Sequence, residues 1–244
     1  MKEYDNEKDF WNREYSECKP VDLRTLTLTV EPTFDACLLL FGEKTSRVCD
    51  FGCGTGDILF QYAQYYPDHS GVGIDVSETG IAFANQTAKL SNYNNYKFMV
   101  GNIDTLSEFK DGEFDGIILS NVLDVMPEKI ANETVKELNR VLKDRGYWFI
   151  KVNPFYSREE IKEIGYREIG MHMYAENGVL RLRQEPMSYW INYIRHLGKI
   201  ERILEFEYPW QEGLNRLFLV RKENYRVHMR NHDTGRENQL KMSA

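Results

Sequence analysis

The sequence lacks any apolar run of the roughly 18–20 residues that a membrane-spanning helix requires. Its first residues, MKEYDNEKDFWNREY, also lack the apolar stretch of a secretory signal peptide. These two absences predict a cytoplasmic protein that makes no contact with a membrane.

Cysteine is scarce as well, with 4 residues in a chain of 244. None of them forms the paired C-x-x-C spacing of structural zinc sites, and so few thiols do not make a disulfide framework. We therefore expect buried, reduced cysteines and no metal site. The four residues are Cys18, Cys37, Cys49 and Cys53.

Positive charge is also scarce. The chain has 31 Lys and Arg residues but 38 Asp and Glu residues, which gives a formal net charge of -7. A large nucleic-acid surface relies on Lys and Arg to neutralise phosphates, so this balance argues against nucleic acid as a partner. Basic residues towards the C-terminus keep nucleic acid open as a minority alternative. They are Arg221, Lys222, Arg226, Arg230, Arg236 and Lys241.

With 42% hydrophobic residues and only 7 prolines, the chain can nevertheless bury a substantial core. From about residue 47 to residue 153, short apolar runs alternate with helical patterns, which is typical of a parallel sheet with crossover helices. One such amphipathic helix is expected at Glu128–Lys143. The expected strands are Arg47–Phe51, Gly71–Asp75, Tyr96–Val100, Phe114–Ser120 and Gly146–Asn153.

The pattern then changes. Residues 166–185 predict two strands around Asn177-Gly178, a dipeptide suited to a tight hairpin turn, and a helix is expected at Met187–Leu197. A closing pair of strands at Ile200–Tyr208 and Leu214–Lys222 would add an antiparallel edge. We expect a Rossmann-like α/β fold with a seven-stranded, mostly parallel sheet, an antiparallel last strand, helices on both faces, and a hairpin and helix insertion between strands five and six.

The segment VCDFGCGTGD at residues 48–57 places three glycines between an expected strand and an expected helix. Glycine lets a ligand approach bare backbone at the carboxyl end of a sheet. The dinucleotide pattern G-x-G-x-x-G, begun at Gly52, needs a third glycine where this chain has Asp57, and no Gly-Lys-Ser or Gly-Lys-Thr follows for a P-loop. A carboxylate there would repel a diphosphate and tolerate a cationic ligand, so we expect a loop that binds something other than a dinucleotide.

The second expected strand ends at Asp75, where a carboxylate can accept hydrogen bonds from both hydroxyls of a ribose. Asn102 and Ile103 follow the third expected strand. Asn102 can accept from an exocyclic amine and Ile103 can pack on a ring, so these residues indicate an adenosine-type ligand.

Together these segments resemble the class I S-adenosylmethionine-dependent methyltransferases, in particular the small-molecule group near the ubiquinone-biosynthesis methyltransferases. Residues 50–56, DFGCGTG, match the family's first motif, and Asp75 matches its ribose-binding acid. Residues 114–120, FDGIILS, match its fourth strand, and residues 138–147, LNRVLKDRGY, match the helix-to-strand stretch that follows. The resemblance covers about residues 47–153 and implies S-adenosylmethionine as cofactor and S-adenosylhomocysteine as product.

The resemblance also implies a set of cofactor-binding residues. Asp50 would lie near the methionine amino group, the glycine loop would line the methionine and ribose, and Ser120 would border the methyl-transfer site. Where the family commonly has Gly-Asp, this chain has Gly101-Asn102, which keeps the acceptor oxygen and loses the charge. The whole expected set is Asp50, Gly52, Cys53, Gly54, Gly56, Asp75, Val76, Asn102, Ile103, Ser120 and, as a lid contact, Tyr15.

The same resemblance divides the chain into parts. Residues 1–28, with their aromatic segment, would form an N-terminal lid helix region. Residues 29–222 would form the methyltransferase domain, in which residues 155–197 are an insertion that serves as a substrate lid. Residues 223–244 are polar and lack apolar periodicity, so we expect a mobile tail.

Methyl transfer from a sulfonium needs mainly alignment and desolvation, with a general base only where the nucleophile loses a proton. Two catalytic candidates are Asp124, just after the fourth strand, and His172, on the expected hairpin. A helix cap or a surface carboxylate is the alternative role of Asp124. Five aromatic residues form either a substrate wall or ordinary core, namely Tyr166, Tyr174, Tyr189, Trp190 and Tyr193.

The favoured function is methyl transfer to an oxygen, nitrogen or carbon atom of a small molecule, by a monomer or homodimer. Methylation of nucleic acid or protein is a second hypothesis, although the Asn/Asp-Pro-Pro-aromatic motif of enzymes that methylate base amino groups is absent after the fourth strand. A module that binds the cofactor without turnover is a third, because catalysis by alignment requires no particular catalytic residue.

Overall fold

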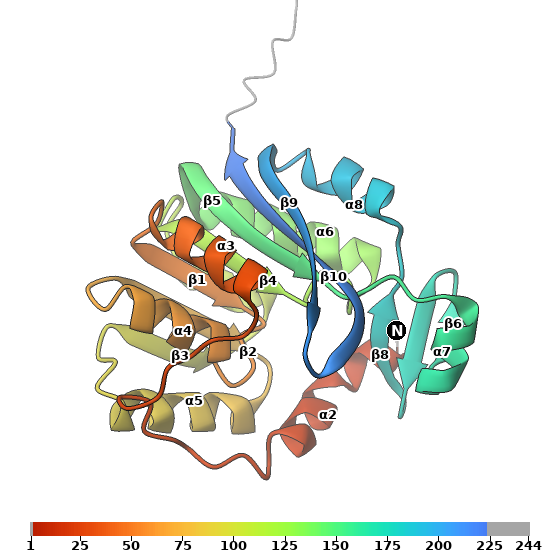
Figure 1. The fold of residues 1–244 in the computed structure, drawn as a ribbon, viewed down its shortest axis with the longest axis horizontal. Helices are drawn as coiled ribbons and strands as arrows, with labels where there is room; N and C mark the ends of the chain where they lie inside the picture. Colours follow the sequence, from red (N-terminus) through yellow and green to blue (C-terminus); the bar gives the residue numbers. More distant parts are fainter. Residues whose placement is uncertain (1, 224–244) are drawn as a thin grey trace, which may run out of the picture.

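Seven strands form the central sheet of the computed structural model, which describes residues 2–223 (Figure 1). They are β1 (Arg47–Phe51), β2 (Ser70–Asp75), β3 (Tyr96–Val100), β4 (Phe114–Ser120), β5 (Leu142–Val152), β9 (Gly198–Tyr208) and β10 (Gln211–Lys222). The order across the sheet is β3-β2-β1-β4-β5-β10-β9, and β10 is antiparallel to both of its neighbours. The first five strands are parallel, so their carboxyl ends meet at one edge of the sheet.

Helices cover both faces of this sheet. One face carries α3 (Pro32–Gly42), α4 (Asp57–Tyr65) and α5 (Glu78–Leu90), and the other carries η1 (Ile103–Glu108), α6 (Glu128–Val141) and α8 (Met187–Ile194). Successive residues of a strand point to opposite faces, so Ile117 and Leu119 pack with α6 while Ile118 packs on the α3 side. Within residues 2–223, every helix is too short or too polar to cross a membrane.

Between β5 and β9 the chain forms a small unit of its own, which we call the insertion. It contains α7 (Arg158–Ile164) and a three-stranded sheet of β6 (Arg167–Gly170), β7 (Met173–Glu176) and β8 (Val179–Arg183), before α8 returns to the main sheet. Asn177 and Gly178 have φ angles of 51° and 78°, and they form the expected tight turn between β7 and β8.

At the N-terminus, α1 (Lys2–Asp5) and α2 (Glu7–Glu14) form a helical segment interrupted at Asn6. We call residues 2–15 the N-terminal arm. In Figure 1 the arm lies below the sheet, between α5 and the insertion.

The expected Rossmann-like fold is confirmed, including the antiparallel closing strands and the insertion before them. The expectation of only two strands in the insertion is wrong, because β6 adds a third; its four residues are too few and too exposed to show a strand pattern. Apart from Glu223, the expected mobile tail at residues 223–244 lies outside the described residues.

One expected boundary also differs. α6 ends at Val141, and β5 starts at once with Leu142, where we expected the helix to reach Lys143 and the strand to start at Gly146. The start of β5 is irregular, because Arg145 has a φ of 63°. Continuous pairing with β4 begins only at Tyr147, which is in register with Gly116.

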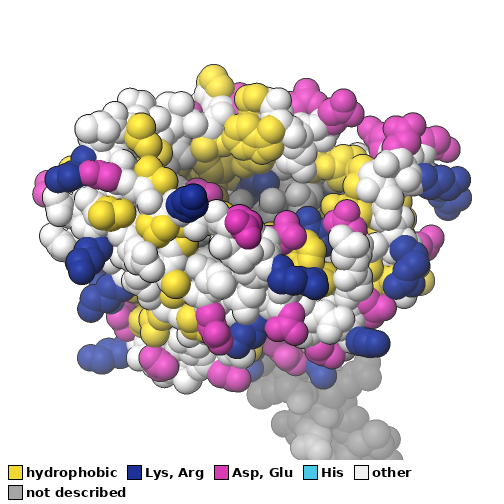
Figure 2. Space-filling view, turned by 90° about the horizontal axis from the view of Figure 1, so that it is seen from below, with side chains coloured by type: hydrophobic (Ala, Val, Ile, Leu, Met, Phe, Trp, Pro, Cys, Tyr) yellow, Lys and Arg dark blue, Asp and Glu magenta, His cyan; other side chains and the backbone are white. Residues whose placement is uncertain are grey.

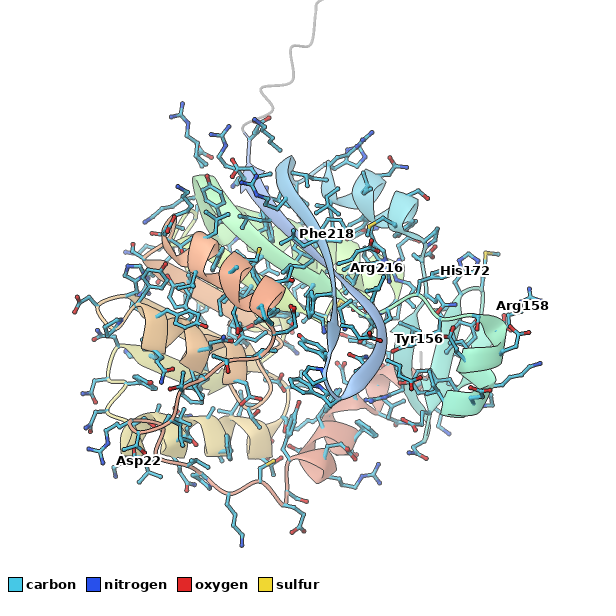
Figure 3. All side chains as sticks on the ribbon, viewed as in Figure 1. Asp22, Tyr156, Arg158, His172, Arg216 and Phe218 are labelled. Atoms are coloured by element: carbon cyan, nitrogen blue, oxygen red, sulfur yellow. The ribbon has the colours of Figure 1, made fainter. Side chains whose placement is uncertain are left out.

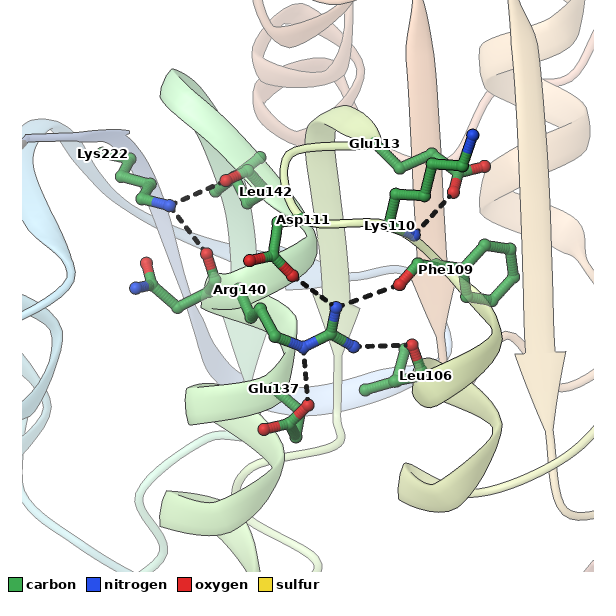
Figure 4. Close-up of polar contacts among 10 residues, drawn as sticks. Leu106, Phe109, Lys110, Asp111, Glu113, Glu137, Arg140, Leu142 and Lys222 are labelled. Atoms are coloured by element: carbon green, nitrogen blue, oxygen red, sulfur yellow. Dashed lines mark hydrogen bonds and ion pairs between the residues drawn. The ribbon is translucent and has the colours of Figure 1, made fainter.

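Arg140 ties α6 to η1, the segment that follows β3 (Figure 4). Its guanidinium donates to the carbonyl oxygens of Leu106 at 2.8 Å and Phe109 at 3.0 Å. It also forms ion pairs with Asp111 at 2.8 Å and Glu137 at 2.9 Å. One side chain thus fixes the position of the loop in which the expected base-binding residues lie.

Replacing Arg140 with methionine is expected to lower the melting temperature by about 3–6 °C, because two carbonyl groups lose a charged donor, at a cost of about 1.5 kcal/mol. Thermal unfolding followed by circular dichroism measures this. The control is Arg24→Met, which breaks an exposed pair with Asp22 and should change the melting temperature by less than about 1 °C. Equal melting temperatures of the two variants would contradict the role given to Arg140.

Candidate functional site

The glycine loop after β1 crosses the carboxyl edge of the sheet. Gly52, Gly54 and Gly56 all have positive φ angles, of 74°, 54° and 87°. A Cβ atom on Gly52 would lie 2.6 Å from Val122, and one on Gly56 would lie 2.6 Å from the ring of Phe98. Only glycine fits these positions, so the loop presents bare backbone to the edge.

Asp75, at the end of β2, is held by two backbone amides. Its Oδ2 accepts from the N–H of Gly54 and its Oδ1 accepts from the N–H of Ser77, both at 2.8 Å. A carboxylate oxygen can accept more than one hydrogen bond, so both atoms keep capacity for a further donor such as a hydroxyl. The carboxylate therefore lies where the sequence predicts a ribose contact, with Val76 next to it at the start of the loop to α5.

Acidic side chains gather beneath this loop. Asp50 is only 2% exposed, and burial, followed by the charges of Asp75 and Asp57, raises its pKa to about 8. Burial also raises the pKa values of Asp57 and Asp75. No described residue donates a hydrogen bond to the Asp50 carboxylate, and no cation is among the groups that set these three pKa values. Such an arrangement favours a cationic ligand.

Glu7, on the N-terminal arm, belongs to the same acidic group. Burial raises its pKa to about 7, and the charge of Asp75 contributes, while a hydrogen bond with Tyr4 opposes the shift. Within residues 2–223, no three Asp, Glu, His or Cys side chains are arranged to hold a metal ion.

Tyr15 closes the loop from the other side. Its hydroxyl lies 2.8 Å from the position that a Cβ atom on Gly54 would occupy, and its ring lies 2.9 Å from that position on Gly80. Asn12 fixes this part of the arm, since its Oδ1 accepts from Ser77 Oγ at 2.9 Å and from the N–H of Thr79 at 3.2 Å. The arm therefore covers the glycine loop and the start of α5.

The insertion holds the arm in place through Arg181 of β8. The guanidinium lies 4.7 Å from the ring centre of Phe10 and 5.1 Å from that of Trp11, and Trp11 in turn stacks on Tyr15 at 5.4 Å. Asn6 donates to the carbonyl oxygen of Gly178 at 3.1 Å. The arm thus connects the cofactor loop with the insertion.

Asn102 and Ile103 lie beyond β3 as expected, but Asn102 has a structural task. Its Oδ1 accepts from the N–H of Asp104 at 2.8 Å, and its own N–H donates to Thr105 at 3.2 Å, so it caps η1. The same oxygen can accept a second hydrogen bond, and the side chain is exposed. Ile103 is half-buried against the α6 side of the core.

Ser120 ends β4, the strand next to β1, and Asp124 follows it. Asp124 is fully buried: its Oδ2 accepts from the N–H of Asn153 at 2.6 Å, and its Oδ1 has no donor among the described residues. The N-cap of α6 is Pro127, which makes no side-chain cap bond, so the helix-cap and surface alternatives for Asp124 are wrong. Burial raises its pKa, and the bond from Asn153 and the charge of Lys151 oppose the shift.

His172, the second catalytic candidate, lies on the turn between β6 and β7 with a φ of 58°. Its ring is 54% exposed and lies 3.2 Å from Glu185. Figure 3 shows His172, Arg216 and Tyr156 on the side of β10 that faces the insertion. Its catalytic role stays a prediction, as does that of Asp124.

Three of the five aromatic residues belong to the core, and Tyr166 lies elsewhere. Trp190 is fully buried, and Tyr189 and Tyr193 pack with it against the α6 side of the sheet, so these three belong to the core. Tyr166 instead lines an open groove of about 420 Å³ between α7 and the start of β10. The other lining residues are Tyr156, Glu160, Glu163, Ile164, Gln211 and Glu212.

Figure 2 shows the molecule hollowed at its centre when it is viewed from below Figure 1. Hydrophobic side chains gather on one rim, and charged side chains of both signs surround the hollow. Trp210 and Leu214, in and beside the loop between β9 and β10, are among the exposed hydrophobic residues of the protein.

Sequence reasoning missed Glu7 and Lys151. Glu7 comes from a segment far from the glycine loop in the chain, and no local pattern places it there. Lys151 left a signal, because it is the one charged residue in the apolar run YWFIKV at residues 147–152 of a buried strand. A lysine at such a position needs either an ionic partner or a function.

Comparison with known proteins gives a family. The family model described as a methyltransferase domain matches residues 43–165, just over half of the chain. An uncharacterised methyltransferase of Schizosaccharomyces pombe is 31% identical over 121 residues, which are 47% of this chain and 42% of that protein. A putative methyltransferase of Bacillus subtilis is 31% identical over 122 residues, covering 48% of this chain and 47% of that protein. The chain spans less than half the length of these relatives.

Solved structures agree on the fold. A protein of Pyrococcus horikoshii has a TM-score of 0.66 at 22% identity, covering 86% of this chain and 99% of that one. A second similar structure is the 1,6-didemethyltoxoflavin-N1-methyltransferase of Burkholderia thailandensis, with bound 1,6-didemethyltoxoflavin and S-adenosylhomocysteine. It has a TM-score of 0.61 at 14% identity, and the match covers 79% of this chain and 78% of that one. With the domain match and this fold together, the chain belongs to the class I S-adenosylmethionine-dependent methyltransferases.

Proposed function

We propose that this protein transfers the methyl group of S-adenosylmethionine to an oxygen, nitrogen or carbon atom of a small molecule. The observation that carries the proposal is a group of three carboxylates around a glycine loop, with Asp50 buried, Asp75 half-buried and Asp57 at the surface. S-Adenosylmethionine bears a sulfonium and an ammonium, which such a group would attract. The membership of the family and the small-molecule methyltransferase among the structural neighbours support the same reaction.

The residues around the loop have distinct tasks in this proposal. Asp75 binds the ribose hydroxyls, Asp50 attracts the methionine ammonium, and Asn102 offers its second lone pair to the adenine amino group. Backbone from Gly52 to Gly56 lines the cofactor, with Cys53 buried against Gly73 so that only its main chain contributes. Val76 and Ile103 supply apolar contact.

The bound cofactor supplies an electrophilic methyl group, and the chain supplies alignment and exclusion of water. The N-terminal arm covers the loop through Tyr15, and Arg181 keeps the arm seated, so water is displaced from the reaction site. Ser120 borders the methyl position. Where the acceptor must lose a proton, the unpartnered Oδ1 of Asp124 is one candidate to receive it, and the exposed ring of His172 is a second.

The test is a calorimetric titration of the purified protein with S-adenosylhomocysteine, which requires no knowledge of the acceptor. Saturable binding at one site with a Kd near micromolar is the expected result. Absence of heat from a folded, ligand-free sample would contradict the proposal.

Labelled S-adenosylmethionine with a panel of acceptors then separates the remaining hypotheses. Labelled small-molecule product supports the proposed reaction. Labelled RNA or protein instead, together with RNA binding that weakens steeply with salt, would favour the macromolecular alternative. Cofactor binding without any turnover would favour a binding module.

A further inference from the structure

Lys151, next to the last residue of β5, lies at the carboxyl edge of the sheet, where the cofactor loop also lies. Its side chain is 2% exposed. Its strand, β5, pairs with β4, which in turn pairs with β1, and Lys151 is in register with Ser120 of β4. Asp50 is level with Ile118 and Phe149, so Lys151 lies two strands away and two residues further along, at roughly 12 Å between the backbones. Lys151 therefore lies one strand beyond Ser120, the residue that the proposed function puts beside the methyl group.

No described residue accepts a hydrogen bond from the Lys151 ammonium. Its Nζ lies 4.8 Å from the ring centre of Tyr208, and its ionic neighbour is the carboxylate of Asp124. Burial lowers its pKa to about 8, and the charge of Asp124 opposes the shift. The ammonium thus donates no hydrogen bond to a described residue, and its charge is offset by an aromatic ring and by a carboxylate that does not bond to it.

A second buried cation competes for the same carboxylate. Arg216, also 2% exposed, donates to the carbonyl oxygens of Asn153 and Glu185, which carry no charge. Burial lowers the pKa of Arg216, and the negative charges of Asp124 and Glu205 oppose this shift. Glu205 lies on the exposed side of β9. Two buried cations thus share one buried acid. The acceptor end of the site has a surplus of positive charge, whereas the cofactor end has a surplus of negative charge.

We propose that Lys151 binds a carboxylate of the methyl acceptor, so that the substrate class is a small organic acid. The inference rests on the proposed function, because it takes the space beyond Ser120 as the acceptor site. The side-chain oxygens Asp124 Oδ1 and Asn121 Oδ1 are buried and have no hydrogen-bond donor among the described residues. We therefore expect the same acid to carry a hydroxyl or amino group that donates to one of them.

The test uses the protein saturated with S-adenosylhomocysteine, titrated with matched pairs of probes. Each pair is a hydroxy or amino acid, such as 4-hydroxybenzoate or anthranilate, and its neutral amide. At least one acid is expected to bind roughly ten- to hundredfold more tightly than its amide. If no acid binds, or if the amides bind equally well, the proposal is wrong.

Lys151→Met should remove the preference for the acid and leave the Kd of S-adenosylhomocysteine unchanged. The matched control is Lys143→Met, which alters a half-exposed lysine at the opposite end of β5 and should keep the preference. A loss of affinity for S-adenosylhomocysteine in Lys151→Met would show that the lysine binds the carboxylate of the cofactor and would overturn the proposal for the acceptor. Comparing acid with amide on the unaltered protein keeps the test valid if the variant does not fold.

The two proposals fail in different ways. If S-adenosylhomocysteine does not bind the unaltered protein, the proposed function fails. If it binds but acids are not preferred, only the inference about the acceptor fails.

Discussion

Replacing Asp50 with asparagine is expected to stabilise the ligand-free protein and, at the same time, to remove most of its affinity for S-adenosylhomocysteine. The carboxyl group is buried next to Asp75 and Asp57, which raises its pKa to about 8, whereas an aspartate in the unfolded chain has a pKa of about 3.9. As the pH rises from about 4 towards 8, the unfolded chain gives up this proton more readily than the folded one. Stability due to this group is therefore lost as the pH rises.

Asparagine has no charge to bury, so the advantage of the variant should be absent near pH 4 and grow up to about pH 8. Each unit of pKa shift corresponds to about 1.4 kcal/mol, so the gain amounts to several kcal/mol near pH 8. A rise in melting temperature of at least about 4 °C is expected there. Thermal unfolding at a series of pH values measures it, with Asp68→Asn as the control at an exposed position.

Calorimetry gives the other half of the result. Loss of a charged partner for the methionine ammonium should weaken binding of S-adenosylhomocysteine by roughly 30- to 100-fold. A variant that is less stable than the unaltered protein at pH 8, or that binds the ligand normally, would contradict the role given to Asp50.

The local part of the site could be predicted from the sequence. A strand, three glycines, a helix start and an acid at the end of the next strand lie close together in the chain, and parallel strands bring their carboxyl ends to one edge whatever the remaining structure does. Gly52 to Gly56 and Asp75 therefore lie where we expected them. Asn102 follows β3 as expected, and its adenine contact stays a prediction; its capping bond to Asp104 depends on the geometry of η1.

The remote part could not be predicted. Glu7 and Arg181 reach the site only because the N-terminal arm packs between the loop and the insertion, which no periodicity records. The same limit applies to Trp190: an apolar helix face is equally compatible with a core and with a substrate wall until the tertiary structure sets its direction. For Asp124 the tertiary structure removes alternatives that the sequence left open. Its burial excludes a surface role, and Pro127 at the N-cap of α6 excludes the capping role.

Asp75→Ala is expected to weaken binding of S-adenosylhomocysteine by roughly 30- to 150-fold, or about 2–3 kcal/mol, because the ribose loses charge-assisted hydrogen bonds. The carboxylate also holds the N–H groups of Gly54 and Ser77, so part of the loss comes from a less ordered loop. Asp57→Asn is the matched control: it removes one negative charge from the same acidic group without a ribose contact, and a change of less than about fivefold is expected.

A second ligand separates the ribose contact from the ordering of the loop. The 2′-deoxy analogue of S-adenosylhomocysteine lacks one of the hydroxyls that Asp75 is proposed to bind. The unaltered protein should bind this analogue about tenfold less tightly than the parent ligand, whereas Asp75→Ala should bind the two alike, since the interaction is already missing. If the variant still discriminates between the two ligands, the ribose lies elsewhere and Asp75 acts only by holding the glycine loop.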